Sequence, residues 1–172
     1  MDLLVSYNWS HFSQARPEII AILKRFGDPD PQVDKTATIG IAVAHTCLDN
    51  REVIKHCRAL WKNNPLDSFE FAIKWVPVDY WCNTGLDAMK QVIDSHIKDR
   101  IRDNQTWGMK VYKRRWQQYH TIEIVEHLAA DIQQQVDLGN PDWILCVNVI
   151  GQETAISLLK PDEIFSICKP YP

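Results

Sequence analysis

The chain has 172 residues, 45% of them hydrophobic, and a formal net charge of -3 at pH 7. This is enough apolar material for one domain or two small ones, but no run approaches the roughly 18 consecutive apolar residues of a membrane span. The opening residues lack a signal-peptide pattern, and five cysteines without close pairing argue against a disulfide framework, so we expect a cytoplasmic protein with no membrane partner.

The first 76 residues carry the apolar patterns of alternating strands and helices. Strands are predicted at residues 3–7, 39–44 and 69–76. Apolar positions at helical spacing predict one helix that is capped by Ser13 and ends at Gly27, and a second that is capped by Asp49 or Asn50. The predicted order is therefore β-α-β-α-β.

Turn-forming residues between positions 77 and 85 separate a second group of elements from the first. Helices are predicted at residues 86–101 and from Thr121 to about residue 132. Strands are predicted at residues 107–115, 143–150 and 154–159, with Gly151 in a type II′ turn between the last two. We therefore predict a mixed α+β (α/β) chain with subdomains at residues 1–78 and 79–172.

Positive charge is concentrated between residues 98 and 115. Seven basic residues in this segment face two acidic ones, a local charge of +5, so the rest of the chain carries -8. A local basic patch on an acidic protein indicates a polyanionic ligand.

The end of the predicted strand at 107–115 is the strongest candidate site, because a helix begins shortly after it. Side-chain charges and the free N–H groups of a first helical turn both attract phosphate. The candidate RNA-binding residues are Lys98, Lys110, Lys113, Arg114, Arg115, His120 and Thr121. The neighbouring aromatic residues Tyr112, Trp116 and Tyr119 could stack on an unpaired base. The alternative interpretation is a solvated basic face with these aromatic rings in the core.

Other site chemistries have weak support in the sequence. No phosphate loop, dinucleotide-binding glycine motif, nucleophile elbow or zinc-protease motif occurs, and no CxxC pair suggests a metal site. We therefore predict no cofactor, no metal and no catalytic residue. Two alternatives stay open: a small phosphate-handling enzyme on a ferredoxin-like scaffold, and a protein-interaction module that uses the acidic face of residues 123–131.

Four segments together resemble the THUMP domain. They are DAMKQVIDSHIKDRI, WGMKVYKRRW, HTIEIVEHLAADI and VDLGNPDWILCVNVIGQETAISLL, in that order. A basic strand end, a helix opened by His120 and Thr121, and a Val-Asp-Leu…Asn-Pro-Asp turn at residues 136–142 carry the resemblance. Residues 79–172 would then be a THUMP RNA-binding domain, and residues 1–78 would resemble the ferredoxin-like domain that usually precedes it.

The resemblance implies a role in tRNA modification. Members of this family bind tRNA, with the 3′ acceptor end as the usual landmark, and catalysis lies in a separate domain. Too few of the given residues follow these segments for such a domain, so we expect the stand-alone type, which presents tRNA to a separate cytidine acetyltransferase. We expect a non-catalytic adaptor with tRNA and a modifying enzyme as partners. Neutralising about four phosphates would give a slope of log affinity against log salt near -3 to -4.

Overall fold

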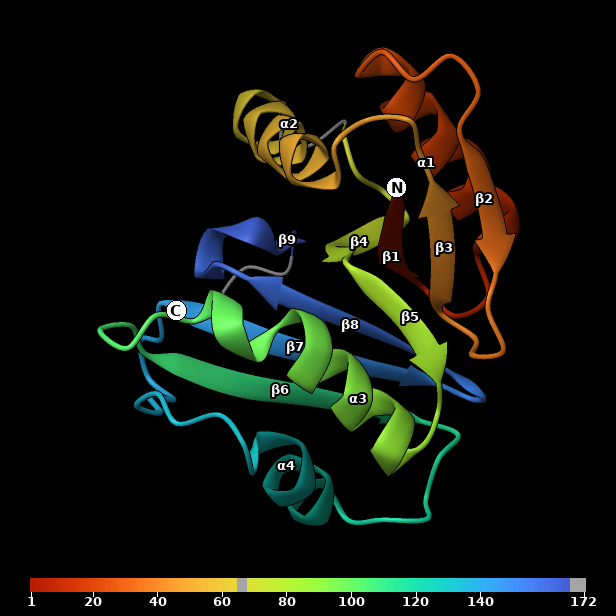
Figure 1. The fold of residues 1–172 in the computed structure, drawn as a ribbon. Coiled ribbons are helices and arrows are strands. Elements are labelled where there is room, and N and C mark those ends of the chain that lie inside the picture. The colour runs from red at the N-terminus through yellow and green to blue at the C-terminus, as the bar shows by residue number, and fades with distance from the viewer. Residues whose placement is uncertain (65–67, 168–172) are drawn as a thin grey trace. The chain divides into compact units, whose positions relative to one another are not determined.

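The computed structural model describes residues 1–64 and 68–167. Contacts along the chain divide it into two units, which Figure 1 shows as ribbons. The first is Met1–Val78 together with the segment that begins at Asp162, and the second is Asp79–Pro161. The segment from Asp162, which we had placed in the second subdomain, thus groups with the first unit. Among the described residues, no helix is long and apolar enough to cross a membrane.

The first unit has the strand order of a ferredoxin-like fold. Its elements are β1 (Asp2–Tyr7), α1 (Phe12–Arg25), β2 (Gln32–Lys35), β3 (Ile41–His45), α2 (Asn50–Asn63), β4 (Ala72–Val78), η2 (Pro161–Glu163) and β9 (Phe165–Ser166). The sheet runs β2-β3-β1-β4-β9, and every neighbouring pair is antiparallel. Two β-α-β halves interleave in this order, so the predicted ferredoxin-like fold is confirmed. The predicted order β-α-β-α-β lacked β2, because Val33 is the one buried residue of that short strand.

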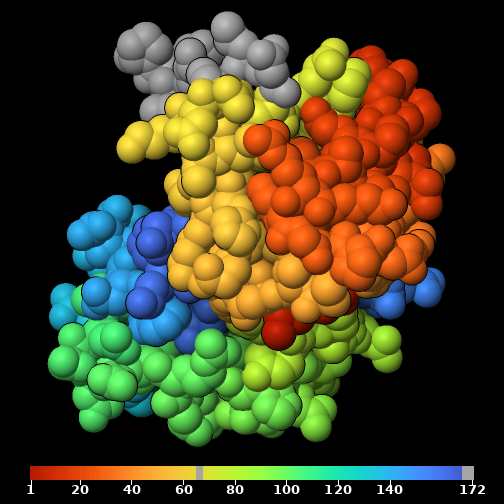
Figure 2. Space-filling model, turned by 90° about the horizontal axis from the view of Figure 1, so that it is seen from above, coloured from red at the N-terminus to blue at the C-terminus, as the bar shows by residue number. Residues whose placement is uncertain are grey.

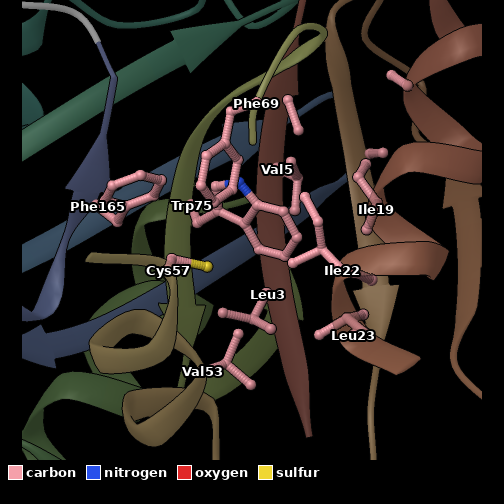
Figure 3. Packing of buried hydrophobic residues seen from close by; sticks show 14 of the residues in the cluster. Leu3, Val5, Ile19, Ile22, Leu23, Val53, Cys57, Phe69, Trp75 and Phe165 are labelled. Atoms are coloured by element: carbon pink, nitrogen blue, oxygen red, sulfur yellow. The ribbon is translucent and has the colours of Figure 1, made fainter. Parts of the chain in front are cut away.

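Helices α1 and α2 bury one apolar face each against this sheet. Ile19, Leu23, Val53 and Cys57 from the two helices meet Trp75 of β4 in a continuous buried cluster (Figure 3). Side chains of α2 (gold) lie beside those of the α1–β2 segment (red to orange) on the surface of this unit in Figure 2. Burial raises the pKa of the Cys57 thiol well above its ordinary value, as expected for a cysteine that packs as a small apolar residue.

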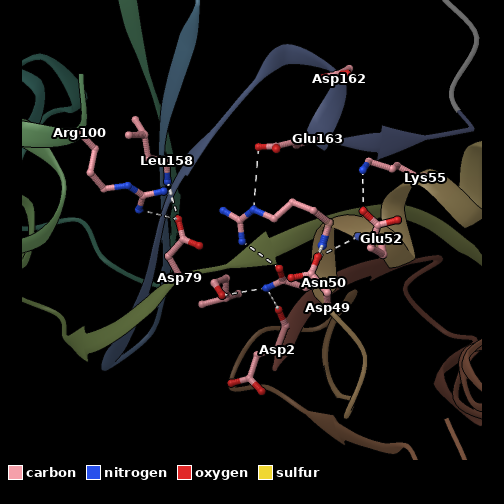
Figure 4. A network of polar contacts seen from close by, with 12 residues as sticks. Asp2, Asp49, Asn50, Glu52, Lys55, Asp79, Arg100, Leu158, Asp162 and Glu163 are labelled. Carbon is pink, nitrogen blue, oxygen red and sulfur yellow. Dashed lines mark hydrogen bonds and ion pairs between the residues drawn. The ribbon is translucent and has the colours of Figure 1, made fainter. Parts of the chain in front are cut away.

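The helix starts of the first unit only partly follow the prediction. Asp49 caps α2, because its carboxylate accepts hydrogen bonds from the Arg51 and Glu52 N–H groups at 2.9 and 3.0 Å. The side-chain amide of Asn50 then donates to the Asp2 and Val78 carbonyls, which ties α2 to two strands (Figure 4). Ser13 is not the cap of α1: the helix begins at Phe12, and His11 occupies the cap position.

The second unit is a four-stranded sheet with two helices. Its elements are β5 (Tyr80–Asn83), α3 (Leu86–His96), η1 (Lys98–Arg100), β6 (Trp107–Arg114), α4 (Thr121–Ala129), β7 (Trp143–Ile150) and β8 (Glu153–Leu159). The strand order is β5-β8-β7-β6, with β6 parallel to β7 and the other pairs antiparallel. Strand β6 is therefore an edge strand. The fold is mixed α+β, as predicted.

Both helices of the second unit pack on the same face of its sheet. Met89 and Ile93 of α3, together with Ile124 and Leu128 of α4, form one buried cluster with the odd-numbered residues of β7. Strands β6, β7 and β8 were predicted nearly to the residue, whereas β5 lies where only a turn was predicted. Helix α4 ends at Ala129 and not near residue 132, and α3 stops at His96 instead of continuing to residue 101. Ile97 and Ile101 are still buried. The apolar spacing therefore continues beyond the end of the α-helix, which is why the predicted helix was too long.

Candidate nucleic-acid interface

The alternation of strand β6 divides its basic residues between the two faces of the sheet. Trp107, Met109 and Val111 face the helices and join the apolar cluster. Successive strand residues point to opposite sides, so Lys110 and Arg114 share the other face and Lys113 lies on the helix side. The basic run that is continuous in sequence is therefore split in space.

Lys113 already has a partner within the protein. Its ammonium group donates a hydrogen bond to the Tyr119 carbonyl at 2.6 Å, and this contact is partly buried. The bond fixes the connection between β6 and α4. Lys113 therefore contributes to the shape of the site more directly than to its free charge.

Arg114 has a buried donor atom without a partner among the described residues. Its side chain is half-buried, its guanidinium carbon lies 5.6 Å from the centre of the Tyr112 ring, and its Nη1 is buried without a hydrogen-bond partner. Burial lowers the pKa of the Arg114 guanidinium from its ordinary value. A buried donor with no acceptor is costly, and the half of the Arg114 side chain that is exposed can attract an anionic oxygen.

Arg115 follows in a strained backbone conformation. Its φ is 58°, a left-handed value that residues other than glycine seldom adopt, and among the described residues it is the only non-glycine residue with positive φ. The side chain is exposed. Lys110 is also exposed, and we call Lys110, Arg114 and Arg115 the basic strand end.

The start of α4 differs from the predicted phosphate cradle. His120, not Thr121, holds the cap position, and the His120 N–H donates to the Glu123 carboxylate at 2.6 Å. Thr121 is the first helical residue, and both side chains are exposed. The Glu123 carboxylate therefore takes up one of the N–H groups that were expected to bind phosphate. It also places a negative charge at the start of the helix, where phosphate was expected. The His-x-x-Glu spacing resembles a capping box and was the overlooked signal.

Lys98 is not brought to the basic strand end. It lies in η1, and its charge helps to lower the pKa of Asp131, although the hydrogen bond from Lys90 is the main cause. Asp131 follows the last turn of α4, whereas Arg114 precedes the first turn. The nine residues of α4 separate the two ends by about 13 Å. Arg100, another cation of the basic segment, lies 3.7 Å from the Asp79 carboxylate (Figure 4).

Two of the aromatic candidates pack against the protein. Trp116 and Tyr119 are partly buried against the apolar cluster of the second unit, with ring centres 5.5 Å apart. Tyr112 is partly buried too and lies against Arg114. The alternative in which these rings belong to the core therefore describes Trp116 and Tyr119 better than stacking on a base.

The Val-Asp-Leu…Asn-Pro-Asp turn holds strand β6 in place. The Asp137 carboxylate accepts hydrogen bonds from the Gly139 and Asn140 N–H groups at 2.8 and 3.0 Å. Asp142 accepts from the Thr106 N–H at 2.8 Å. A Cβ on Gly108 would lie only 3.1 Å from the Asp137 carbonyl, so the turn approaches the strand at a position where glycine is needed. These residues position the interface and do not form it.

No protein-family model matches the sequence, and no curated protein is significantly similar to it. Solved structures do share its fold. PH1313 from Pyrococcus horikoshii and TrmN from Thermus thermophilus are 14% and 11% identical, cover 92% and 94% of this chain, and each have a TM-score of 0.62. A protein from Listeria monocytogenes described as a predicted N6-adenine-specific DNA methylase is 13% identical over 91% of the chain, with a TM-score of 0.53.

The chain spans 55%, 47% and 39% of the lengths of these three structures. The similarity covers nearly all of the present chain, and the identities are low enough that it concerns the fold. The predicted fold class, a mixed α+β chain whose first unit is ferredoxin-like, is confirmed. In the described part of the chain, no group of three or more histidine, cysteine, aspartate or glutamate side chains could hold a metal ion.

Proposed function

We propose that the protein binds tRNA through the basic strand end. The observation that carries this proposal is the half-buried Arg114 guanidinium, which has an unpartnered Nη1 and lies between exposed Lys110 and Arg115 in sequence on an acidic chain. A planar guanidinium with free donors suits phosphate oxygens. The left-handed backbone at Arg115 also fits a functional position, because such strain is concentrated at sites.

The comparisons support a nucleic-acid ligand. One structure of similar fold is described as a predicted DNA methylase, and the THUMP resemblance implies tRNA with the acceptor end as landmark. With Lys113 engaged by Tyr119 and Glu123 at the start of α4, three cations are left for phosphate. Affinity should therefore be moderate.

We further propose that the chain is a non-catalytic adaptor that presents tRNA to a separate modifying enzyme. The resemblance to stand-alone THUMP proteins suggests a cytidine acetyltransferase. Acetylation of tRNA by such an enzyme should rise when the purified chain is added. An unchanged rate across saturating amounts of the chain would contradict this partner.

Substitution of Arg114 by glutamate tests the binding surface. Arg114→Glu replaces the partly buried cation with an anion, so tRNA affinity at low salt should fall by at least about tenfold. The measurement is a gel-shift titration with folded tRNA. Lys24→Glu, which makes the same charge change at an exposed position of α1, is the matched control and should bind almost as the parent does. Equal binding by Arg114→Glu and Lys24→Glu would rule out this surface.

A further inference from the structure

The first unit contains a cavity that the basic strand end does not explain. It has a volume of about 360 Å³ and lies between the connection from β1 to α1 and the loop that joins β2 to β3. The Tyr7 N–H donates to the Gly40 carbonyl at 2.9 Å, which holds the two segments together. This volume is within the range of sites for small ligands.

The walls of the cavity combine flat apolar surface with hydroxyl groups. Trp9 is 80% exposed and Ile39 is 66% exposed, although tryptophan usually buries most of its ring. The edge of the Trp9 indole lies over Gly40, where a Cβ would be only 3.2 Å from its ring carbon, so glycine leaves room for the ring. The rest of the indole is an open stacking surface.

Polar groups around the cavity are matched to a neutral or negative ligand. Thr38 lines the cavity, and its hydroxyl oxygen is buried without a hydrogen-bond partner within the described chain. Lys35 supplies a positive charge and lies 4.9 Å from the Phe12 ring centre. None of the described residues that line the cavity is acidic.

We propose that this cavity holds one unpaired nucleotide of an RNA strand, with its base on Trp9 and its phosphate near Lys35. An aromatic platform beside a cation is the usual recognition of single-stranded nucleic acid, since every base has a stacking face. The choice of RNA rests on the proposed function, whereas the pocket itself is independent of the basic strand end. An aromatic peptide side chain would use the platform but would leave Lys35 without an anionic group.

The test uses a fluorescein-labelled hexa-adenylate RNA and fluorescence anisotropy, with all proteins carrying Arg114→Glu to remove binding at the basic strand end. Trp9→Ala should weaken binding by at least about fivefold, the loss expected for one stacked base. Trp9→Phe keeps an aromatic face and should restore most of the affinity. Leu138→Ala, which shortens an equally exposed apolar side chain in the second unit, is the control and should have no effect.

The outcomes separate this inference from the proposed function. If Trp9→Ala binds the oligonucleotide as tightly as its parent does, the proposed nucleotide pocket is refuted. This holds whatever effect Arg114→Glu has on tRNA binding. If Trp9→Ala weakens oligonucleotide binding while Arg114→Glu leaves tRNA binding intact, the proposed nucleotide pocket is supported. The proposal that tRNA binds at the basic strand end is then refuted. Circular dichroism of each variant confirms that a loss of binding is not a loss of fold.

Discussion

At the scale of single residues, the basic cluster contains cations in different roles. Lys110 is exposed, Arg114 is half-buried with a free donor, and Lys113 is bonded to the Tyr119 carbonyl. From the sequence, all three were predicted to bind phosphate, because a sequence shows charge but does not show hydrogen-bond partners. Strand alternation alone would have separated Lys113 from its two neighbours.

These different roles predict that the same substitution will affect stability differently at Lys113 and at Lys110. Lys113→Met keeps the aliphatic stem but removes the bond to Tyr119, so the free energy of unfolding should fall by about 1 to 2 kcal/mol. Lys110→Met should change it by less than about 0.5 kcal/mol, because the side chain is exposed. Urea denaturation measures both values.

Binding of tRNA completes the comparison of the two lysines. Lys110→Met should weaken binding severalfold, and Lys113→Met should have the smaller effect at a temperature where both variants are folded. A Lys113 variant with unchanged stability but the larger binding loss would show that Lys113 contacts the phosphates.

At the scale of elements, periodic segments were predictable and short or irregular ones were not. The long strands β6, β7 and β8 and the helices have clear apolar spacing, which is why they were predicted. Strand β2 has one buried residue, Val33, and β9 has two residues in all, so neither has a period to read. Strand β5 lies among turn-forming residues, where Asp79 accepts a hydrogen bond from the Leu158 N–H at 2.9 Å.

The turn that precedes β7 should give the protein a specific acid sensitivity. Hydrogen bonds from the Asn140 and Gly139 N–H groups hold the pKa of the Asp137 carboxyl below its ordinary value of 3.8. A lowered pKa means that the carboxylate stabilises the fold at neutral pH, and that this contribution is lost as the pH falls below about 4. Asp137→Ala should therefore lower the melting temperature at pH 7, and the difference from the parent should shrink towards pH 3.

Differential scanning calorimetry at several pH values checks this prediction. Asp137→Asn can still accept the two backbone hydrogen bonds, so it should retain more stability than Asp137→Ala at pH 7. A difference between parent and Asp137→Ala that stays constant down to pH 3 would contradict the role given to the carboxylate.

At the scale of the whole molecule, charge limits the interaction. The chain has a net charge of -3, so attraction of tRNA depends on a local patch and not on the overall field. The sequence suggested about four phosphate contacts, from Lys110, Lys113, Arg114 and Arg115. The structure reduces the unengaged cations there to Lys110, Arg114 and Arg115, because Lys113 has a backbone partner. Lys98 lies in η1, and its charge acts on Asp131, which follows the last turn of α4.

The salt dependence of tRNA binding tests this account most directly. Three phosphate contacts predict a slope of log affinity against log salt of about -2 to -3, and Lys110→Met should make the slope shallower by about 0.7 to 0.9. The titrations compare the parent, Lys110→Met and the control Lys24→Met, whose slope should equal that of the parent. A parent slope near zero, or the same slope for the parent and Lys110→Met, would contradict tRNA binding at the basic strand end.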